Sequence, residues 1–222
     1  MNILDLFSVN TIFFTIFDYP MSYIEFIGTI LYLWSVWLIS KNNILTWPVG
    51  IISVILYMLL FYQIRLYSDA AEQIYYLGAS IYGWWAWDKS QKAAEADKLN
   101  IRLSQPRTLL RWLAVTALGT ILLTLFVSRL HLFLPTLFPD PAAYPFIDAL
   151  TTVMSFTAMF LMAQRRLESW YYWIIVDIIG IWLYAVQGVR FISLLYVILL
   201  IMAINGLRLW LQERNHTTSH AY

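Results

Sequence analysis

The sequence predicts an all-α membrane protein in which seven transmembrane helices form two parallel three-helix repeats joined by a linker helix. Three observations support this fold class. Hydrophobic residues make up 61% of the chain and charged residues 12%, against the roughly 25% of charged residues in soluble domains. Seven stretches are apolar over the roughly 17–25 residues that a spanning helix needs. Finally, the first three stretches resemble the last three at a constant offset along the chain.

The first 20 residues precede the first span and contain two charges, Asp5 and Asp18. They have no basic segment and so lack the form of a cleaved signal peptide, and their phenylalanines predict a short helix at the membrane interface. The predicted regions are this N-terminal interfacial helix (1–20), a first three-helix repeat (21–88), a cytoplasmic loop with the linker span and an outer loop (89–145), a second three-helix repeat (146–212) and a cytoplasmic tail (213–222).

The seven predicted spans are continuous apolar runs with tryptophan and tyrosine near their ends, where such rings favour headgroup depth. Because lipid offers backbone groups no hydrogen bonds, these runs are expected to be helices, and they are too continuous for a β-barrel. The predicted spans are 23–39, 47–64, 70–87, 109–128, 146–163, 170–187 and 191–211.

Lysines and arginines are distributed unevenly between the two sides of the predicted bundle. Arg65, Arg129 and Arg190 fall on the side of the N-terminus, and the remaining 11 of the 14 fall on the opposite side. Basic loops stay in the cytoplasm. The N-terminus is therefore predicted outside the cell and the C-terminus in the cytoplasm.

An internal repeat covers most of the chain. A shift of 123 residues lays residues 24–87 over 147–210 without a gap, with 12 of 64 positions identical. Chance matching of Ile and Leu does not explain the paired tryptophans and glycines, which are Trp47 with Trp170, Gly83 with Gly206 and Trp87 with Trp210. Four crossings separate the two repeats, so they are predicted to run parallel, as in SWEET transporters, whose substrate sites lie at the repeat interface. Duplication for stability alone is the alternative.

Asp177 lies deep within the sixth span, where an ionisable group is a functional candidate by default. Trp170 and Trp173 share its helix face at the i, i+3, i+7 spacing. Indoles that frame a carboxylate suit a flat cation, because the rings offer cation–π attraction and the acid adds Coulomb attraction. The alternative is a structural Asp177 that bonds a neighbouring helix or is protonated. Its repeat partner is Val54, so the predicted site is asymmetric.

The remaining substrate-binding candidates lie on spans three and seven. Gln73 shares a helix face with Tyr76, and its amide can both donate to and accept from an amide or a sugar hydroxyl. An interhelical hydrogen bond explains Gln73 equally well. Tyr196 is the repeat partner of Gln73. Asn205 also lies at membrane depth but roughly opposite Tyr196 around the helix, so one of the two must face away from a shared site.

Two acidic residues, Glu25 and Asp148, begin spans one and five on the predicted outer side. A carboxylate at an interface needs no further explanation, although Asp148 with Thr152 and Ser155 would also suit an outer vestibule. No cofactor and no metal site are predicted, because the chain has no cysteine, no nucleotide-binding or zinc motif, and two of its three histidines lie in the tail. The net charge of +1 gives no indication of a nucleic-acid partner.

The sequence resembles the PnuC family of bacterial nicotinamide riboside transporters over both repeats and the linking span. The resemblance rests on WPVGIISVILYMLLFYQIRLYSDAAEQIYYLGASIYGWWAW (47–87), ESWYYWIIVDIIGIWLYAVQG (168–188) and LLYVILLIMAINGLRLW (194–210). Trp170 and Trp173 match the WxxW stretch of the family and Gln73 matches its span-three glutamine. At Asp177 the chain departs from the pattern of the family, which the resemblance associates with asparagine at this position.

This resemblance implies seven spans in a SWEET-like arrangement in a bacterial inner membrane, with the substrate between the three-helix units. It implies facilitated diffusion of nicotinamide riboside, cytoplasmic phosphorylation by a ribosylnicotinamide kinase that traps the product, and homo-oligomers, with a trimer as one form. The alternatives are another vitamin, such as thiamine or riboflavin, and a different class, a membrane-embedded enzyme. Such an enzyme would need at least two ionisable groups converging at depth, where Asp177 is the strong candidate.

Overall fold

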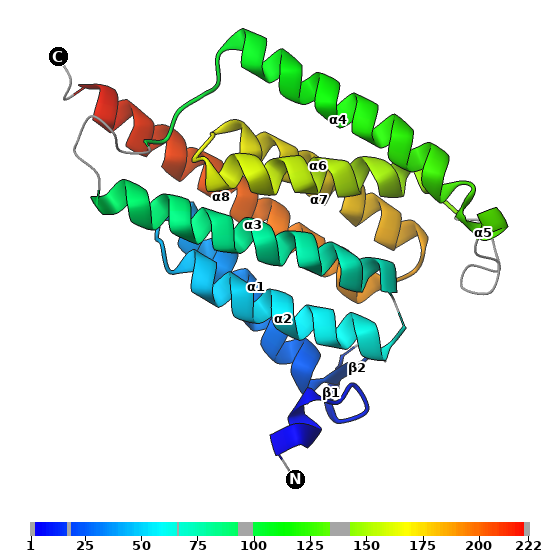
Figure 1. The fold of residues 1–222 in the computed structure, drawn as a ribbon. Coiled ribbons are helices and arrows are strands. Elements are labelled where there is room, and N and C mark those ends of the chain that lie inside the picture. The colour runs from blue at the N-terminus through cyan, green and yellow to red at the C-terminus, as the bar shows by residue number, and fades with distance from the viewer. Residues whose placement is uncertain (1–2, 17–18, 66, 93–99, 134–142, 220–222) are drawn as a thin grey trace.

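The structure is a computed structural model that describes residues 3–16, 19–65, 67–92, 100–133 and 143–219. Its long helices lie lengthwise beside one another, with α4 along one edge of the bundle (Figure 1). The helices are α1 (Tyr23–Ser40), α2 (Thr46–Gln63), α3 (Tyr67–Lys92), α4 (Pro106–Val127), α5 (Leu130–Phe133), α6 (Pro145–Ala163), α7 (Glu168–Val186) and α8 (Arg190–Ser219).

Each of the seven predicted spans coincides with one long helix. Six of these helices are long and apolar enough to cross a membrane by length and composition. The seventh, α3, has 26 residues but is not among the six, because acidic and amide side chains near its start and charged side chains at its end lower its mean hydropathy. At about 1.5 Å per residue it is still about 39 Å long, which exceeds the roughly 30 Å hydrocarbon core of a bilayer.

The long helices pack as two units with α4 at the edge. In the first unit α1 packs on α2 and α2 on α3, and in the second α6 packs on α7 and α7 on α8. The units meet where α1 packs on α8 and α3 on α6, while α4 packs on α6. The interface between the units is therefore formed by the first and third helices of each.

The N-terminal segment differs from the single interfacial helix that the sequence predicted. A 3-10 helix (Ile3–Phe7) is followed by an antiparallel hairpin of β1 (Ile12–Ile16) and β2 (Tyr19–Ser22). The β1 run IFFTI consists of β-branched and aromatic residues, which favour strands, and Pro20 is not tolerated inside a helix. The difference has a local cause, because phenylalanines at the interface suit a strand as well as a helix.

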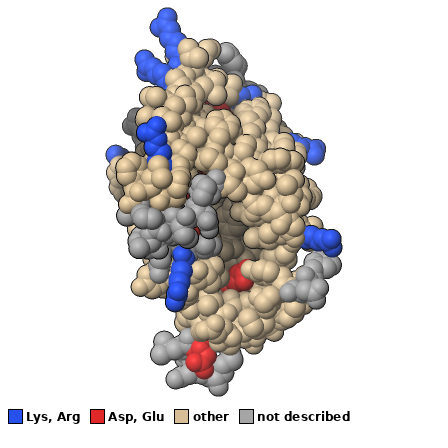
Figure 2. Space-filling view, turned by 90° about the vertical axis from the view of Figure 1, so that its right-hand side faces the viewer, with Lys and Arg blue, Asp and Glu red and all other residues tan. Residues whose placement is uncertain are grey.

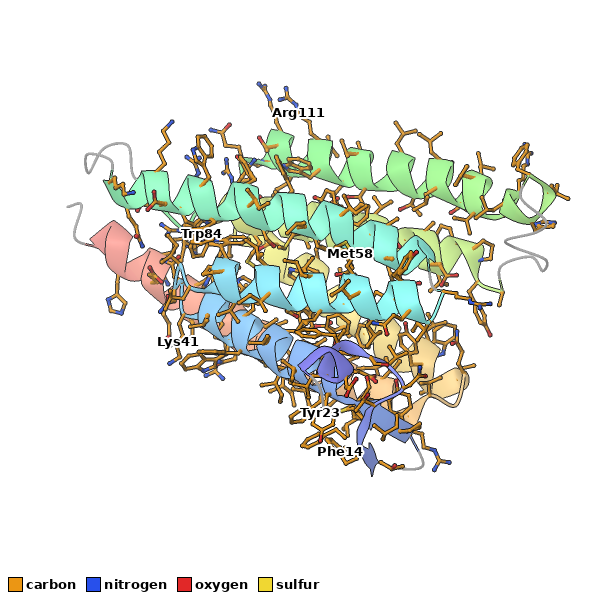
Figure 3. All side chains as sticks on the ribbon, turned by 60° about the horizontal axis from the view of Figure 1, so that its bottom comes forward. Phe14, Tyr23, Lys41, Met58, Trp84 and Arg111 are labelled. Atoms are coloured by element: carbon orange, nitrogen blue, oxygen red, sulfur yellow. The ribbon has the colours of Figure 1, made fainter. Side chains whose placement is uncertain are left out.

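Side chains of the bundle hold the N-terminal segment, hairpin included, over one end of the first unit. The Gln63 amide donates a hydrogen bond to the Phe7 carbonyl at 2.8 Å and accepts one from the Val9 amide at 3.1 Å. Tyr19 stacks on Phe191 of α8 with ring centroids 5.4 Å apart. In Figure 3 the hairpin residue Phe14 lies beside the Tyr23 end of α1, away from the Lys41 end. The hairpin thus contacts both units.

The turns of the two units share their backbone conformation at an offset of 123 residues. Asn42 (φ 53°) and Arg165 (φ 52°) both follow the first helix of a unit, and Arg65 (φ 64°) and Gly188 (φ 78°) both follow the second. A residue in the left-handed region commonly ends a helix. Corresponding helices therefore end in the same way in the two units.

A cluster of four buried tryptophans, called here the tryptophan cluster, occupies the opposite end of the bundle from the hairpin (Trp47, Trp87, Trp170 and Trp210). Trp47 and Trp87 meet edge to face at 5.3 Å and 87°, and Trp170 and Trp210 do so at 5.5 Å and 89°. Two glycines make room for the rings. A Cβ atom on Gly83 would lie 2.4 Å from Trp47, and one on Gly206 would lie 2.4 Å from Trp170.

The segment that precedes α4 joins the turn between α6 and α7 beside this cluster. The Arg102 amide donates to the Arg165 carbonyl at 3.2 Å, and the Leu167 amide donates to the Arg102 carbonyl at 3.1 Å. The Arg165 guanidinium lies 4.2 Å from the centroid of the Trp87 ring, and burial lowers its pKa. The connection between the units is thus fixed to the second unit at its basic end.

Candidate functional site

Asp177, which the sequence predicted to be functional, is a buried carboxylate in the middle of a helix. It lies on α7 and is 4% exposed. Among the described residues, no side chain donates a hydrogen bond to Asp177 or forms an ion pair with it. An unpaired buried carboxylate is unfavourable unless a partner arrives. Asp177 is therefore suited to receive a cationic or hydrogen-bonding ligand.

One tyrosine from each unit lies near this carboxylate. The hydroxyls of Tyr32 on α1 and Tyr196 on α8 lie close enough to interact electrostatically with Asp177. Tyr196 also stacks on Tyr184, with ring centroids 5.4 Å apart. The site thus draws on the first unit through Tyr32 and on the second through α7 and α8.

Gly180 explains why Tyr196 reaches this position. A Cβ atom on Gly180 would lie 2.4 Å from the Tyr196 ring, so only glycine lets α8 approach α7 so closely. Small residues serve this purpose widely at contacts between membrane helices. Since Gly180 follows Asp177 by three residues, the close approach places the Tyr196 ring on the face of α7 that carries the carboxylate.

The predicted span-three residues lie at the same interface. Tyr76 meets Phe156 of α6 at 5.7 Å, its hydroxyl forms a hydrogen bond with Ser155, and it interacts electrostatically with Tyr196 and Tyr32. The Gln73 amide reaches the Asp69 carbonyl of its own helix at 3.5 Å. Gln73 is half-buried and makes no interhelical hydrogen bond among the described residues, so the structure offers no partner that would explain it as a helix–helix contact.

The two predicted tryptophans have different surroundings. Trp170 is 1% exposed and belongs to the tryptophan cluster, where it packs on Gly206. Trp173 lies one turn before Asp177 and is partly buried between two core clusters. The structure therefore keeps Trp173 near Asp177, whereas Trp170 packs away from the carboxylate.

Asn205 does not join these residues. It is exposed on α8, on the same face as Ile198 and Ile201, which are 39% and 63% exposed. Tyr196 lies on the other face of the helix. Of the two residues, one of which was predicted to face away from a shared site, Asn205 is therefore the one that faces away.

Two residues of this region were missed by sequence reasoning. Tyr32 is a polar aromatic residue at mid-span in α1, which is a usable signal, but it lies among other aromatics that suggested packing. Glu72 lies next to Gln73 near the start of α3, and its Oε1 accepts a hydrogen bond from Thr152 at 3.1 Å. The vestibule alternative for Asp148 and Thr152 was thus stated without Glu72, which Thr152 contacts.

Comparison with known proteins adds a separate finding. Residues 22–212 match the family model described as nicotinamide mononucleotide transporter. The nicotinamide riboside transporter PnuC of Escherichia coli K12 is 35% identical, over 98% of this chain and 99% of that protein. The riboflavin/roseoflavin transporter RibM of Streptomyces davaonensis is 27% identical over 91% of each chain. The crystal structure of the vitamin B3 transporter PnuC superposes with a TM-score of 0.64 at 24% identity, covering 86% of this chain and 81% of that one.

Proposed function

This chain belongs to the PnuC family, and on that premise we propose that it carries nicotinamide riboside across the bacterial inner membrane by facilitated diffusion. Its family consists of vitamin transporters, not enzymes, and its apolar helices make it a multi-pass membrane protein. The membrane-embedded enzyme considered from the sequence is therefore set aside.

The observation that carries the choice of substrate is the unpaired Asp177, which lies one helical turn from Trp173 and interacts electrostatically with Tyr32 and Tyr196. Nicotinamide riboside has a flat cationic ring, a carboxamide and ribose hydroxyls. Trp173 and Asp177 suit the cation, and Gln73 suits the carboxamide or the ribose. Tyr76 and Tyr196 add hydroxyls that can donate or accept. Trp170 does not contact the substrate in this proposal but fixes the position of α7 through its packing. Asn205 is not assigned a role in the site.

We propose that seven helices, α3 included, span the membrane as two parallel three-helix repeats in a SWEET-like arrangement. The shared turn conformations, the matched tryptophan–glycine contacts and the length of α3 support this arrangement. The units would rock about the site between them and expose it to either side in turn. The excess of basic residues at the tryptophan end supports a cytoplasmic C-terminus and an outer N-terminus.

Transport is proposed to be downhill, with a cytoplasmic ribosylnicotinamide kinase trapping the product by phosphorylation. The sequence contains no nucleotide-binding motif that would point to transport driven by ATP. Homo-oligomers, including a trimer, are part of the same proposal. Accumulation of nicotinamide riboside against its gradient in sealed vesicles, driven by sodium ions or protons, would contradict facilitated diffusion.

Another vitamin is the second candidate, since the riboflavin transporter RibM is also a relative. Titration calorimetry of the detergent-purified protein with nicotinamide riboside, nicotinamide, thiamine and riboflavin tests the substrate. We expect tight binding of nicotinamide riboside and weaker binding of nicotinamide, which lacks the ribose. A preference for thiamine or riboflavin would overturn the substrate and keep the transporter. If Trp173→Ala and Gln73→Ala both transport like the parent, the site is misplaced.

A further inference from the structure

Three carboxylates gather at the end of the bundle where α3 and α6 begin. They are Asp69 and Glu72 of α3 and Asp148 of α6, and each pair of their charges interacts electrostatically. Thr152 donates its hydroxyl hydrogen to Glu72 at 3.1 Å, which fixes α6 against α3. Figure 2 looks onto this end of the molecule and shows a central hollow with an acidic patch at its lower edge.

These three charges are not balanced by basic partners. The described residues contain no salt bridge to Asp69, Glu72 or Asp148. Repulsion between like charges makes such a cluster unfavourable close to the hydrocarbon region of a membrane. A group of this kind is therefore expected to serve a function. A cation that enters the hollow would relieve the repulsion.

A second observation connects this group to the buried Asp177. Tyr184 interacts electrostatically with all three carboxylates and stacks on Tyr196. The Tyr196 hydroxyl interacts with both Glu72 and Asp177. Asp177 is 96% buried and has no hydrogen-bond or ion-pair partner among the described residues. Tyr184 and Tyr196 therefore connect the three carboxylates at the end of the bundle to Asp177 in its interior.

The internal repeat shows that the fold itself does not require the two α3 carboxylates of this group. At the offset of 123 residues, Asp69 corresponds to Ile192 and Glu72 to Leu195, both on α8. The same helix position thus accepts an apolar residue in the other unit. Asp148 corresponds to Glu25 at the start of α1, so the two α3 carboxylates are the ones that occur on one side of the unit interface alone.

We propose that Asp69, Glu72 and Asp148 form an acidic vestibule that selects cationic over neutral nucleosides before they reach Asp177. This inference rests on the proposed function and adds its charge selectivity. A cleft lined by charges of one sign concentrates the opposite ion and raises its rate of association by about 10- to 1,000-fold, an effect that salt removes. The vestibule would therefore raise the transport rate at low substrate concentration.

The test measures initial uptake into vesicles of nicotinamide riboside, a cation, and of its reduced dihydro form, which is neutral and of similar shape. In the triple variant Asp69→Asn, Glu72→Gln, Asp148→Asn we expect the uptake slope of the cation to fall about 10-fold and that of the neutral form to stay unchanged. The glutamine at position 72 can still accept the Thr152 hydrogen bond. Asp88→Asn removes one charge at the other end of the bundle and is the matched control.

Salt provides a second measurement that needs no variant. Raising the ionic strength from about 0.01 M to about 1 M shortens the Debye length from about 30 Å to about 3 Å. In the parent protein this should lower the uptake slope of the cation alone, and the triple variant should lose the salt dependence. Equal changes for both riboside forms, or an unchanged cation slope in the triple variant, would overturn the vestibule alone. A parent that carries no nicotinamide riboside would overturn the proposed function as well.

Discussion

The indole nitrogen of Trp87 donates a hydrogen bond to the Ala163 carbonyl oxygen at 3.0 Å, which ties α3 of the first unit to the end of α6 in the second. The reciprocal bond runs from Trp210 of α8 to the Ile39 carbonyl near the end of α1, also at 3.0 Å. Carbonyl groups in the last turn of a helix lack intrahelical partners and are open to such bonds. Each unit thus holds the end of a helix that belongs to the other.

Replacing Trp87 or Trp210 by phenylalanine should destabilise the protein. Each variant keeps most of the ring but removes the N–H donor, which is expected to lower the free energy of unfolding by about 0.5–1.5 kcal/mol. Thermal melts in detergent measure the loss. Trp85→Phe is the control, because Trp85 is 58% exposed and should melt like the parent. Equal melting temperatures for all the variants would show that the two bonds do not stabilise the end of the bundle that holds the tryptophan cluster.

Gly83→Ala should destabilise the protein and Gly78→Ala should not, although both lie on α3. A methyl group on Gly83 would collide with the buried Trp47 ring, whereas one on Gly78 would meet nothing within 4 Å. Overpacking typically costs about 1–3 kcal/mol, and replacing an exposed helical glycine by alanine gains up to about 1 kcal/mol. Thermal melts of the two variants should therefore shift in opposite directions. A stable Gly83→Ala protein would mean that the tryptophan cluster repacks easily.

Asp177→Asn should weaken the binding of nicotinamide riboside by about 10-fold, which corresponds to about 1.4 kcal/mol. The amide keeps the size of the side chain and removes its charge, and it replaces one acceptor oxygen by a donor NH2 group. The neutral dihydro riboside should bind the variant and the parent with similar affinity. Titration calorimetry measures both ligands. The same loss of affinity for both would mean that Asp177 acts through its shape or its hydrogen bonds instead of its charge.

Trp173→Ala and Trp170→Ala should separate binding from folding. Trp173 lies beside Asp177, so its loss is expected to weaken binding by about 1–2 kcal/mol while the protein stays folded. Trp170 fills the tryptophan cluster, and its loss should lower stability by about 3–5 kcal/mol. Calorimetry on the first variant and thermal melts on both distinguish the roles. A Trp173→Ala protein with unchanged affinity would exclude stacking on this indole.

The sequence predicted the long helices closely because burial in lipid leaves a direct record in hydropathy. The span expected at 23–39 is the helix Tyr23–Ser40, and that expected at 146–163 is Pro145–Ala163. The hairpin was not predicted, since an aromatic run at an interface satisfies both strand and helix patterns. Asp177 could be chosen as a candidate because a carboxylate within an apolar span is unusual.

Side-chain surroundings were harder to predict, because helical spacing gives a face but not its depth along the helix. Trp170 and Trp173 share the face of Asp177, yet the two turns between Trp170 and Asp177 place the former among other tryptophans. The importance of Glu72 depends on α6, whose Thr152 lies 80 residues away along the chain. Such a contact leaves no local pattern in the sequence.

The crossed tryptophan bonds have a consequence for how the basic end of the bundle opens. The donor of each bond lies on the third helix of one unit and the acceptor on the first helix of the other, so neither unit can move away while a single bond remains. Both bonds must therefore be broken before the units can separate at this end. Opening at this end should be cooperative and all-or-none, with no stable half-open form in which one unit has been released and the other is still held.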